Sequence, residues 1–123
     1  MSNRLVRINE LVQRELNSYL RKRYQSEAAA ITITSVEIAD DLKTGKAHVA
    51  IFGKEDYVAG RMDWLLKHAG ELRREVGRHV VLKWTPAIDY VLDDTPARAA
   101  RVMQVLEEID RLDKEKAPKK DPS

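Results

Sequence analysis

The sequence contains no cysteine, which excludes disulfide bridges, zinc–thiolate sites and thiol chemistry. It also lacks a long uninterrupted apolar run, because arginines and glutamates interrupt the apolar residues from the start of the chain. A signal peptide or a membrane-spanning helix needs such a run. We therefore expect a cytoplasmic protein that stays where it is made and has no membrane partner.

Motifs of common enzymatic chemistry are missing as well. Neither the phosphate-binding pattern GxxxxGK[ST] nor the dinucleotide pattern GxGxxG occurs. The histidines His48, His68 and His79 lack the spacing of a metal site such as HExxH. The paired acids Asp40-Asp41 and Asp93-Asp94 fall in predicted turns, where they usually cap backbone N–H groups. The sequence therefore predicts no catalytic residue, no metal site and no cofactor, which favours a binding protein over an enzyme.

Apolar residues suffice for one hydrophobic core. The 123 residues fit one domain of ordinary size, and 43% of them are apolar. Charged residues reach 34%, although the net charge is only +2. Basic residues predominate over 1–25 and 61–86, and acidic residues over 26–60 and 87–123. The surface can therefore be positive on one side if the two basic blocks meet in the folded chain.

The first half of the chain predicts a helix followed by a β-hairpin. Apolar residues recur at three- and four-residue spacing over about 3–24, which is typical of an amphipathic helix. The stretch 31–38 alternates like a strand, but its phase slips near Ser35, which predicts either a β-bulge or burial of both faces. A second strand is expected over 46–52, after a polar turn.

The next segment predicts a broken helix. Helical spacing covers 55–69, is interrupted at Gly70 and resumes as far as Val76, so we expect two helices joined at a kink at Gly70. Gly77 is a plausible C-terminal stop for the second helix.

The C-terminal part predicts a strand, a helix and a tail. Strand-like residues at 80–84 and 87–92 are separated by Pro86, which indicates an interrupted edge strand or two short strands. Thr95-Pro96 is a typical helix start. The tail 113–123 has nothing to bury and is expected to be disordered. The whole predicts an α+β fold, a three-stranded sheet packed against helices in a single domain over 1–112.

Basic residues follow two of the predicted helices. On the first helix they form one stripe away from the apolar face, made of Arg4, Arg7, Arg14 and Arg21. Around the kink the candidates are Lys67, Gly70, Arg73, Arg74, Arg78 and Lys83. A glycine permits close approach of a backbone, and a helix start presents free N–H groups, which together suit phosphate oxygens. The alternative is a solvated helix whose arginines pair with Glu71 and Glu75. Trp64 and Trp84 could stack on bases, with apolar packing as the favoured role for each.

Several segments together, in their order and spacing, resemble the ribosome-binding factor A family over about residues 3–106. They are Arg7-Ile-Asn-Glu-Leu-Val-Gln-Arg-Glu-Leu16, Thr32-Ile-Thr-Ser-Val-Glu-Ile38, Asp41-Leu-Lys43, Ala47-His-Val49, Gly70-Glu-Leu-Arg-Arg-Glu-Val-Gly-Arg78, Pro86 and Asp94-Thr95.

The resemblance implies a type II KH-like fold and a function. Its members bind the immature small (30S) ribosomal subunit, assist late folding and 5′-end processing of 16S rRNA, support growth in the cold and are not nucleases. The resemblance also implies that an assembly GTPase can assist their release. In this family an interhelical kink of Ala-x-Gly type replaces the usual KH loop. The matching positions here are His68, Ala69 and Gly70, with histidine in place of the first alanine. No feature demands a dimer, so we expect a monomer.

Two other function classes stay open at the level of sequence. One is a protein-interaction module that works through the acidic hairpin tip and the last helix. The other is a small nuclease or RNA-modifying enzyme that uses Asp93, Asp94 or a histidine.

Overall fold

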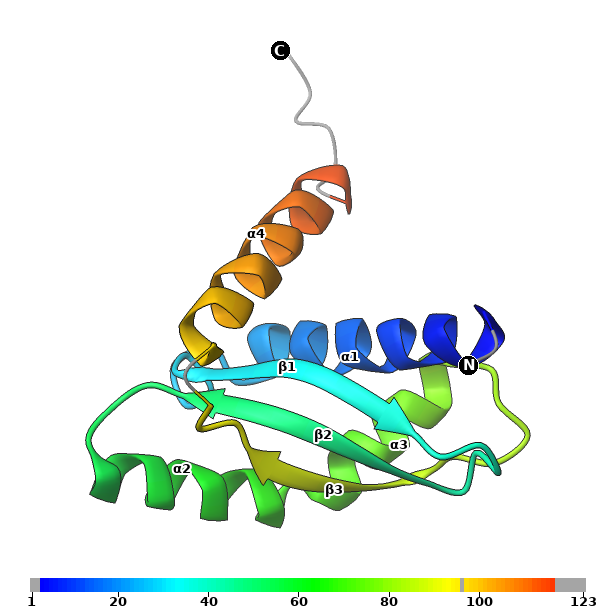
Figure 1. Ribbon diagram of the computed structural model, residues 1–123, viewed down its shortest axis with the longest axis horizontal. Coiled ribbons are helices and arrows are strands. Elements are labelled where there is room, and N and C mark those ends of the chain that lie inside the picture. Colours follow the sequence, from blue (N-terminus) through cyan, green and yellow to red (C-terminus); the bar gives the residue numbers. More distant parts are fainter. Residues whose placement is uncertain (1–2, 96, 117–123) are drawn as a thin grey trace.

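The computed structural model describes residues 3–95 and 97–116 (Figure 1). In chain order the elements are α1 Asn3–Arg23, β1 Ile31–Ile38, β2 Thr44–Ile51, α2 Glu55–Lys67, α3 Ala69–His79, β3 Ala87–Leu92 and α4 Arg98–Lys116. This order confirms the predicted α+β class, with one three-stranded sheet and four helices. No helix in the described ranges is long and apolar enough to cross a membrane.

The sheet has the order β1-β2-β3, with β1 antiparallel and β3 parallel to the central strand β2. Ile33 pairs with Val49 and Ser35 with His48, so Thr34 is an extra residue between two adjacent pairs. The phase slip predicted near Ser35 is therefore a β-bulge.

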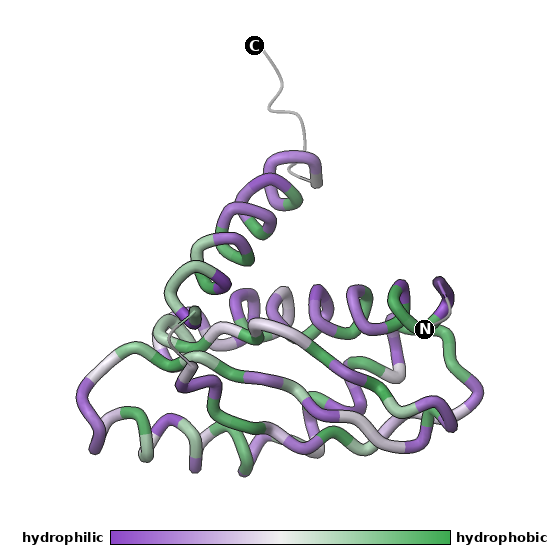
Figure 2. Tube along the Cα trace, viewed as in Figure 1, coloured by the Kyte–Doolittle hydropathy of each residue, from purple (hydrophilic) through white to green (hydrophobic). Residues whose placement is uncertain are grey.

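Helices α1 and α3 pack beside each other against one face of the sheet, and apolar residues fill the space between them (Figure 1). Val12 and Leu16 of α1, Leu72 of α3, and Ile33 and Val49 of the sheet are all buried there. Figure 2 shows the same division, with apolar stretches on the central strand and purple, hydrophilic turns along the outer face of α1. Full burial of one such side chain contributes about 1.5–3 kcal/mol, so this interface is the main source of stability.

The break between α2 and α3 lies at His68, the first of the three positions His68, Ala69 and Gly70 expected for the kink, while Gly70 itself lies within α3. His68 has φ −97° and ψ 4°, outside the helical region, and Ala69 already belongs to α3. Its ring stays with the preceding turn, where Nδ1 lies 2.7 Å from the Trp64 carbonyl oxygen. The ring also packs 4.1 Å from Trp64 and 5.0 Å from Tyr24, between centroids. The break therefore coincides with the residue whose ring packs on Trp64 and Tyr24, and Gly70 lies in the first turn of α3.

Three further boundaries differ from the sequence-based expectation. The segment 80–84 is not a strand, because β3 at Ala87–Leu92 already occupies the edge of β2 and Val80 still donates its N–H to the Val76 carbonyl oxygen. Gly77 does not stop α3, which continues to His79. Helix α4 continues to Lys116, into the segment expected to be disordered, and the rest of that expectation, 117–123, lies outside the described residues.

Candidate nucleic-acid interface

Helix α1 lies between α3 on one side and α4 on the other. On the α3 side, Tyr19 and Tyr24 donate their hydroxyls to the carboxylate of Glu71, at 2.6 and 2.8 Å for Tyr24. The hydrogen bonds from Tyr19 and Tyr24 lower the pKa of Glu71. The bond between Tyr19 and Glu71 also raises the pKa of Tyr19 to about 12. Glu71 is therefore engaged with tyrosines, and does not pair with arginines as the alternative interpretation of this helix supposed.

A second contact on the α3 side joins two glutamates through a histidine. Nδ1 of His79 lies 2.9 Å from Oε1 of Glu15 and 3.0 Å from Oε1 of Glu75. The three side chains bring their ligand atoms within 4.8 Å of one another, which is a geometry able to hold a metal ion. Sequence spacing predicted no such group, because Glu15 is 60 or more residues away from the other two. The contacts of His79 with Glu15 and Glu75 connect α1 with α3, so the cluster is explained by helix packing.

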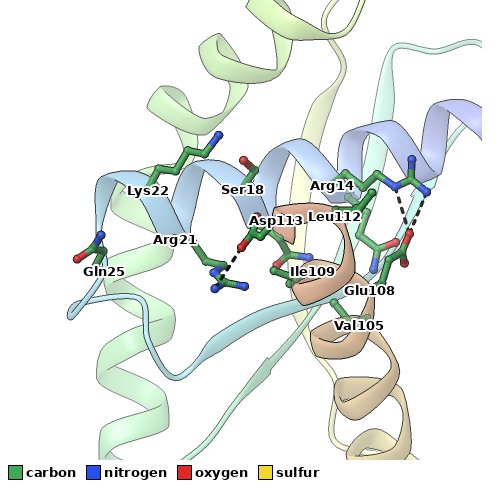
Figure 3. A pocket seen from close by; sticks show the side chains of 12 residues that line it. Arg14, Ser18, Arg21, Lys22, Gln25, Val105, Glu108, Ile109, Leu112 and Asp113 are labelled. Carbon is green, nitrogen blue, oxygen red and sulfur yellow. Dashed lines mark hydrogen bonds and ion pairs between the residues drawn. The ribbon is translucent and has the colours of Figure 1, made fainter. Parts of the chain in front are cut away.

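On the opposite side of α1, two of the predicted RNA-binding arginines pair with α4 (Figure 3). Arg14 donates from Nη2 to Oε1 of Glu108 at 2.9 Å, and from Nε at 3.2 Å. Arg21 lies 3.3 Å from Asp113 and 3.9 Å from Asp110. A groove of about 360 Å³ runs between the two helices, beneath these pairs. Neighbouring carboxylates therefore already neutralise Arg14 and Arg21.

Of the arginines of α3, Arg73 and Arg78 have partners within the protein, and Arg74 has no ion pair among the described residues. Arg73 donates to the Thr85 carbonyl oxygen at 2.9 Å from Nη2, and Arg78 lies 3.3 Å from Glu75. Arg74 is exposed, and within the described part of the chain it forms no ion pair.

The start of α3 is open. Gly70 is exposed in the first turn, and a Cβ added there would meet nothing within 4 Å. The side chain of His68 does not cap the helix. Lys67 is exposed directly before the break and, across residues 3–95 and 97–116, has no ionic partner. Free N–H groups at a helix start, with open space and a cation beside them, suit a phosphate group.

Arg4, Arg7 and Lys83 lie at the other end of α3. The Oδ1 atom of Asn9 accepts the N–H of Ile38, which places the beginning of α1 at the end of β1. The hairpin tip follows at once, and Ala87 donates to the Lys43 carbonyl oxygen there. Figure 1 shows the beginning of α1, the hairpin tip and the segment after α3 at one end of the molecule. We call this part, with Arg4, Arg7, Lys43, Lys83 and Trp84, the basic end, and the exposed acids Asp40 and Asp41 of the hairpin tip lie in it as well.

The predicted residues therefore do not form one cradle. Arg14 and Arg21 are separated from the arginines of α3 by α1 itself, because the two groups lie on opposite sides of that helix. Of the predicted residues, those without an ionic partner in the described ranges are Arg4, Arg7, Lys67, Arg73, Arg74 and Lys83, and Arg73 is engaged with the Thr85 carbonyl oxygen. Lys43 of the hairpin tip also has no ionic partner there. Lys43 was not among the predicted residues, since only the fold brings the hairpin tip to the loop before β3.

Asp93, an open candidate for catalysis, is buried and fully engaged. It accepts hydrogen bonds from Arg101 at 2.7 Å and from the hydroxyls of Thr95 and Thr34 at 3.0 and 3.2 Å. These bonds, led by that from Arg101, lower the pKa of Asp93 to about 2. A carboxylate held ionised in this way is a poor proton acceptor, and the predicted capping role fits its contacts.

Known proteins resemble this chain in both sequence and fold. A sequence model described as "Ribosome-binding factor A" matches residues 4–106. Proteins of that name from Opitutus terrae and Akkermansia muciniphila are 56% and 34% identical, over 90% of this chain and 91% and 88% of theirs. The crystal structure of ribosome-binding factor A from Thermus thermophilus matches with a TM-score of 0.63 at 16% identity, over 72% of this chain and 94% of that one. A Thermotoga maritima protein solved by NMR matches with a TM-score of 0.66 at 18% identity, over 79% and 94%. The chain belongs to the ribosome-binding factor A family.

Proposed function

We propose that this chain binds the immature small (30S) ribosomal subunit through its 16S rRNA and assists late maturation of that RNA, including 5′-end processing, without catalysing a reaction itself. Membership of a family named for ribosome binding supports a ribosomal partner. The observation that carries the RNA contact is the group of exposed cations on α1 and α3 that have no ionic partner in the described ranges, a group that includes Arg4, Arg7 and Arg74. Guanidinium groups without a carboxylate partner are free to bind phosphate oxygens.

The proposed mechanism is selection of one RNA conformation. Phosphates bind Arg4, Arg7 and Arg74, and one further phosphate binds the open first turn of α3 at Gly70, next to Lys67. A protein that binds one local fold of the maturing RNA better than its competitors shifts the RNA population towards that fold. Under this proposal the protein works as a monomer in the cytoplasm, supports growth in the cold, and is released with the help of an assembly GTPase.

The test compares two triple variants with the same change in charge. One replaces Arg4, Arg7 and Arg74 with Gln, and the control replaces Arg98, Arg111 and Lys114 of α4 with Gln. Each protein is sedimented with purified small subunits through sucrose gradients at two salt concentrations. The first variant should no longer co-sediment with small subunits, even at the lower of the two salt concentrations. The control should co-sediment as the parent does at both concentrations. Equal co-sedimentation of the two variants, with both folded by circular dichroism, would refute the assigned surface.

Ribonuclease treatment separates the proposal from a protein-interaction module. If the chain contacts rRNA, limited digestion of the subunits should release it, together with the exposed RNA fragments. Binding that survives complete digestion of the RNA would show that ribosomal proteins are the partner instead.

A further inference from the structure

The segment between α3 and β3 carries a tryptophan that the core does not use. About half of the surface of Trp84 is exposed, and Val81 in the same segment is 99% exposed. The other tryptophan, Trp64, is partly buried, and packs against His68 and against Tyr24 at a centroid distance of 5.0 Å. The favoured role of apolar packing therefore fits Trp64 and not Trp84.

Two lysines lie against the ring of Trp84. The Nζ atom of Lys83 is 4.7 Å from the ring centroid, and Nζ of Lys43, from the hairpin tip, is 5.3 Å away. Both are cation–π contacts over the ring, so a base that stacks on the indole would displace an ammonium group from the ring towards the adjacent phosphates. In the described ranges neither lysine pairs with a carboxylate.

Contacts from α3 and from the hairpin tip hold the backbone that follows Trp84 in place. Arg73 of α3 donates to the Thr85 carbonyl oxygen, and Pro86 is buried. Ala87 donates its N–H to the Lys43 carbonyl oxygen at 3.0 Å, which joins the segment to the hairpin tip. In that tip, Oδ1 of Asp41 accepts the N–H of Lys43 at 2.9 Å. The backbone that carries Lys43 and Trp84 is therefore positioned before any ligand arrives.

An exposed aromatic ring flanked by unneutralised cations is the chemistry that binds single-stranded nucleic acid. A base stacks on the ring, and the cations contact the flanking phosphates. A protein partner for an exposed tryptophan usually offers an apolar pocket, and charged residues are depleted at the centre of such interfaces. The lysines at this ring therefore favour RNA over protein as the occupant. Bases inside an A-form helix are stacked on one another and present no free face, so the occupant must be unpaired.

We propose that Trp84, Lys43 and Lys83 form a binding site for an unpaired nucleotide, with the base stacked on the indole and the lysines on its phosphates. This inference rests on the proposed contact with rRNA, and adds that one end of the molecule requires a looped-out or single-stranded base. The side chains of Lys83 and Trp84 are exposed, so their substitution does not alter the core, whereas Trp64 is partly buried.

Fluorescence reports directly on the stacking. The chain has two tryptophans, so Trp64→Phe leaves Trp84 as the only one. This variant is titrated with an unstructured 12-nucleotide RNA of mixed sequence and with the duplex of the same sequence. The single strand should quench Trp84 emission in a saturable way, and the duplex should not.

Affinity provides a second measurement that does not depend on the Trp64 variant. The same single strand, labelled with a dye, is titrated by anisotropy with the parent protein, Trp84→Phe and Trp84→Ala. Loss of stacking in Trp84→Ala should weaken binding by about 5- to 100-fold, whereas Trp84→Phe should retain most of the affinity. Lys83→Gln should make binding less dependent on salt.

Four results would overturn the nucleotide site. Binding of the single strand without quenching, with equal affinity for Trp84→Ala and the parent, would reject stacking but leave the rRNA contact intact. Equal quenching by the duplex would reject the requirement for an unpaired base. No binding of the single strand at all would also reject the site, while sedimentation with small subunits still decides the proposed function. Loss of subunit binding in Trp84→Ala, with RNA affinity unchanged, would identify a ribosomal protein as the occupant.

Discussion

Asp93 shows how much a single residue can contribute to joining two elements. It follows β3 directly, and its carboxylate binds Arg101 of α4, Thr95 at the start of that helix, and Thr34 at the bulge of β1. The side chain is only 4% exposed, so these hydrogen bonds replace the water that burial removes. The connection between the sheet and α4 therefore depends on one ionised group.

Acid should weaken this connection. The pKa of Asp93 is lowered from 3.8 to about 2 in the folded protein, so its contribution to stability is complete above about pH 4 and is lost as the pH falls towards 2. A shift of this size corresponds to about 2 kcal/mol. Urea denaturation at pH 7, 4 and 2.5 should show this loss in the parent. Asp93→Asn should be less stable at pH 7 and should lose less stability in acid.

The control for Asp93 is the exposed neighbour Asp94. Asp94→Asn should have the stability and the acid dependence of the parent. If Asp93→Asn lost stability between pH 4 and 2.5 as steeply as the parent, other carboxylates would have to account for the acid sensitivity.

Two helical glycines make opposite predictions. A Cβ at Gly60, in α2, would meet nothing within 4 Å, so Gly60→Ala should raise stability by about 0.5–1 kcal/mol through helix propensity alone. A Cβ at Gly77, in α3, would lie 2.7 Å from Oγ1 of Thr85, too close for contact. Gly77→Ala should therefore lower the melting temperature measured by circular dichroism. A rise for both variants would mean that the segment at Thr85 moves freely away from α3.

Sequence reasoning could identify residue types at this scale but not their partners. The turn role of Asp93 followed from its neighbours in the chain. Its bonds to Thr34 and Arg101 did not, because Thr34 is 59 residues away. The same holds for Glu71 with Tyr19 and Tyr24, where helix periodicity suggested arginine partners three or four residues away. Contacts of this kind depend on which helix faces meet, which the sequence pattern alone does not specify.

At the scale of elements, the position of α4 decides which arginines of α1 remain available for RNA. Its first half is held to the sheet through Arg101 and Asp93, while its second half reaches across α1 to Arg14 and Arg21 (Figure 3). The match to the family's sequence model ends at residue 106, so Glu108 and Asp113 lie beyond that model. The resemblance covered the basic stripe of α1 and not the carboxylates that neutralise part of it.

Removing these two carboxylates should free Arg14 and weaken the pairing of Arg21, which keeps Asp110 at 3.9 Å. Glu108→Gln combined with Asp113→Asn should change stability by less than about 1 kcal/mol, because both pairs are exposed to solvent. If Arg14 and Arg21 contact RNA once they are free, affinity for small subunits should rise, and its salt dependence should steepen by about one or two in log–log slope. The measurement is co-sedimentation over a range of salt concentrations.

A matched double variant distinguishes this effect from general charge. Glu107→Gln combined with Asp63→Asn also removes two negative charges, but from carboxylates without an ion pair in the described ranges, and it leaves the pairs between α4 and α1 intact. An equal gain in affinity for both double variants would show that net charge alone is responsible, and that Arg14 and Arg21 have no specific part in binding.

The order and type of the elements could be predicted from periodicity, because each has a clear apolar pattern of its own. The strand-like residues of 80–84 misled this approach. Val80 caps α3 by donating its N–H to the Val76 carbonyl oxygen, and Val81 faces solvent. The β-branched residues of this segment therefore have no neighbouring strand with which to pair. The helix break falls at the first position of the expected kink, His68, whose ring packs on Trp64, and the glycine used to locate it lies within α3.

At the scale of the whole molecule, a net charge of +2 is too small to attract RNA by itself, so binding must depend on where the charges lie. The basic end and α3 carry Arg4, Arg7, Lys43, Arg74 and Lys83 without ionic partners in the described ranges. If all five contact phosphates of single-stranded RNA, the logarithm of the binding constant should fall with the logarithm of salt concentration with a slope of about −3.5. Gln substitution of Arg4, Arg7 and Arg74 together should reduce this slope to about −1.5, whereas the matched α4 triple variant should leave it near −3.5. Equal slopes for the two variants would mean that affinity follows total charge, and that the distribution created by the fold has no role in recognition.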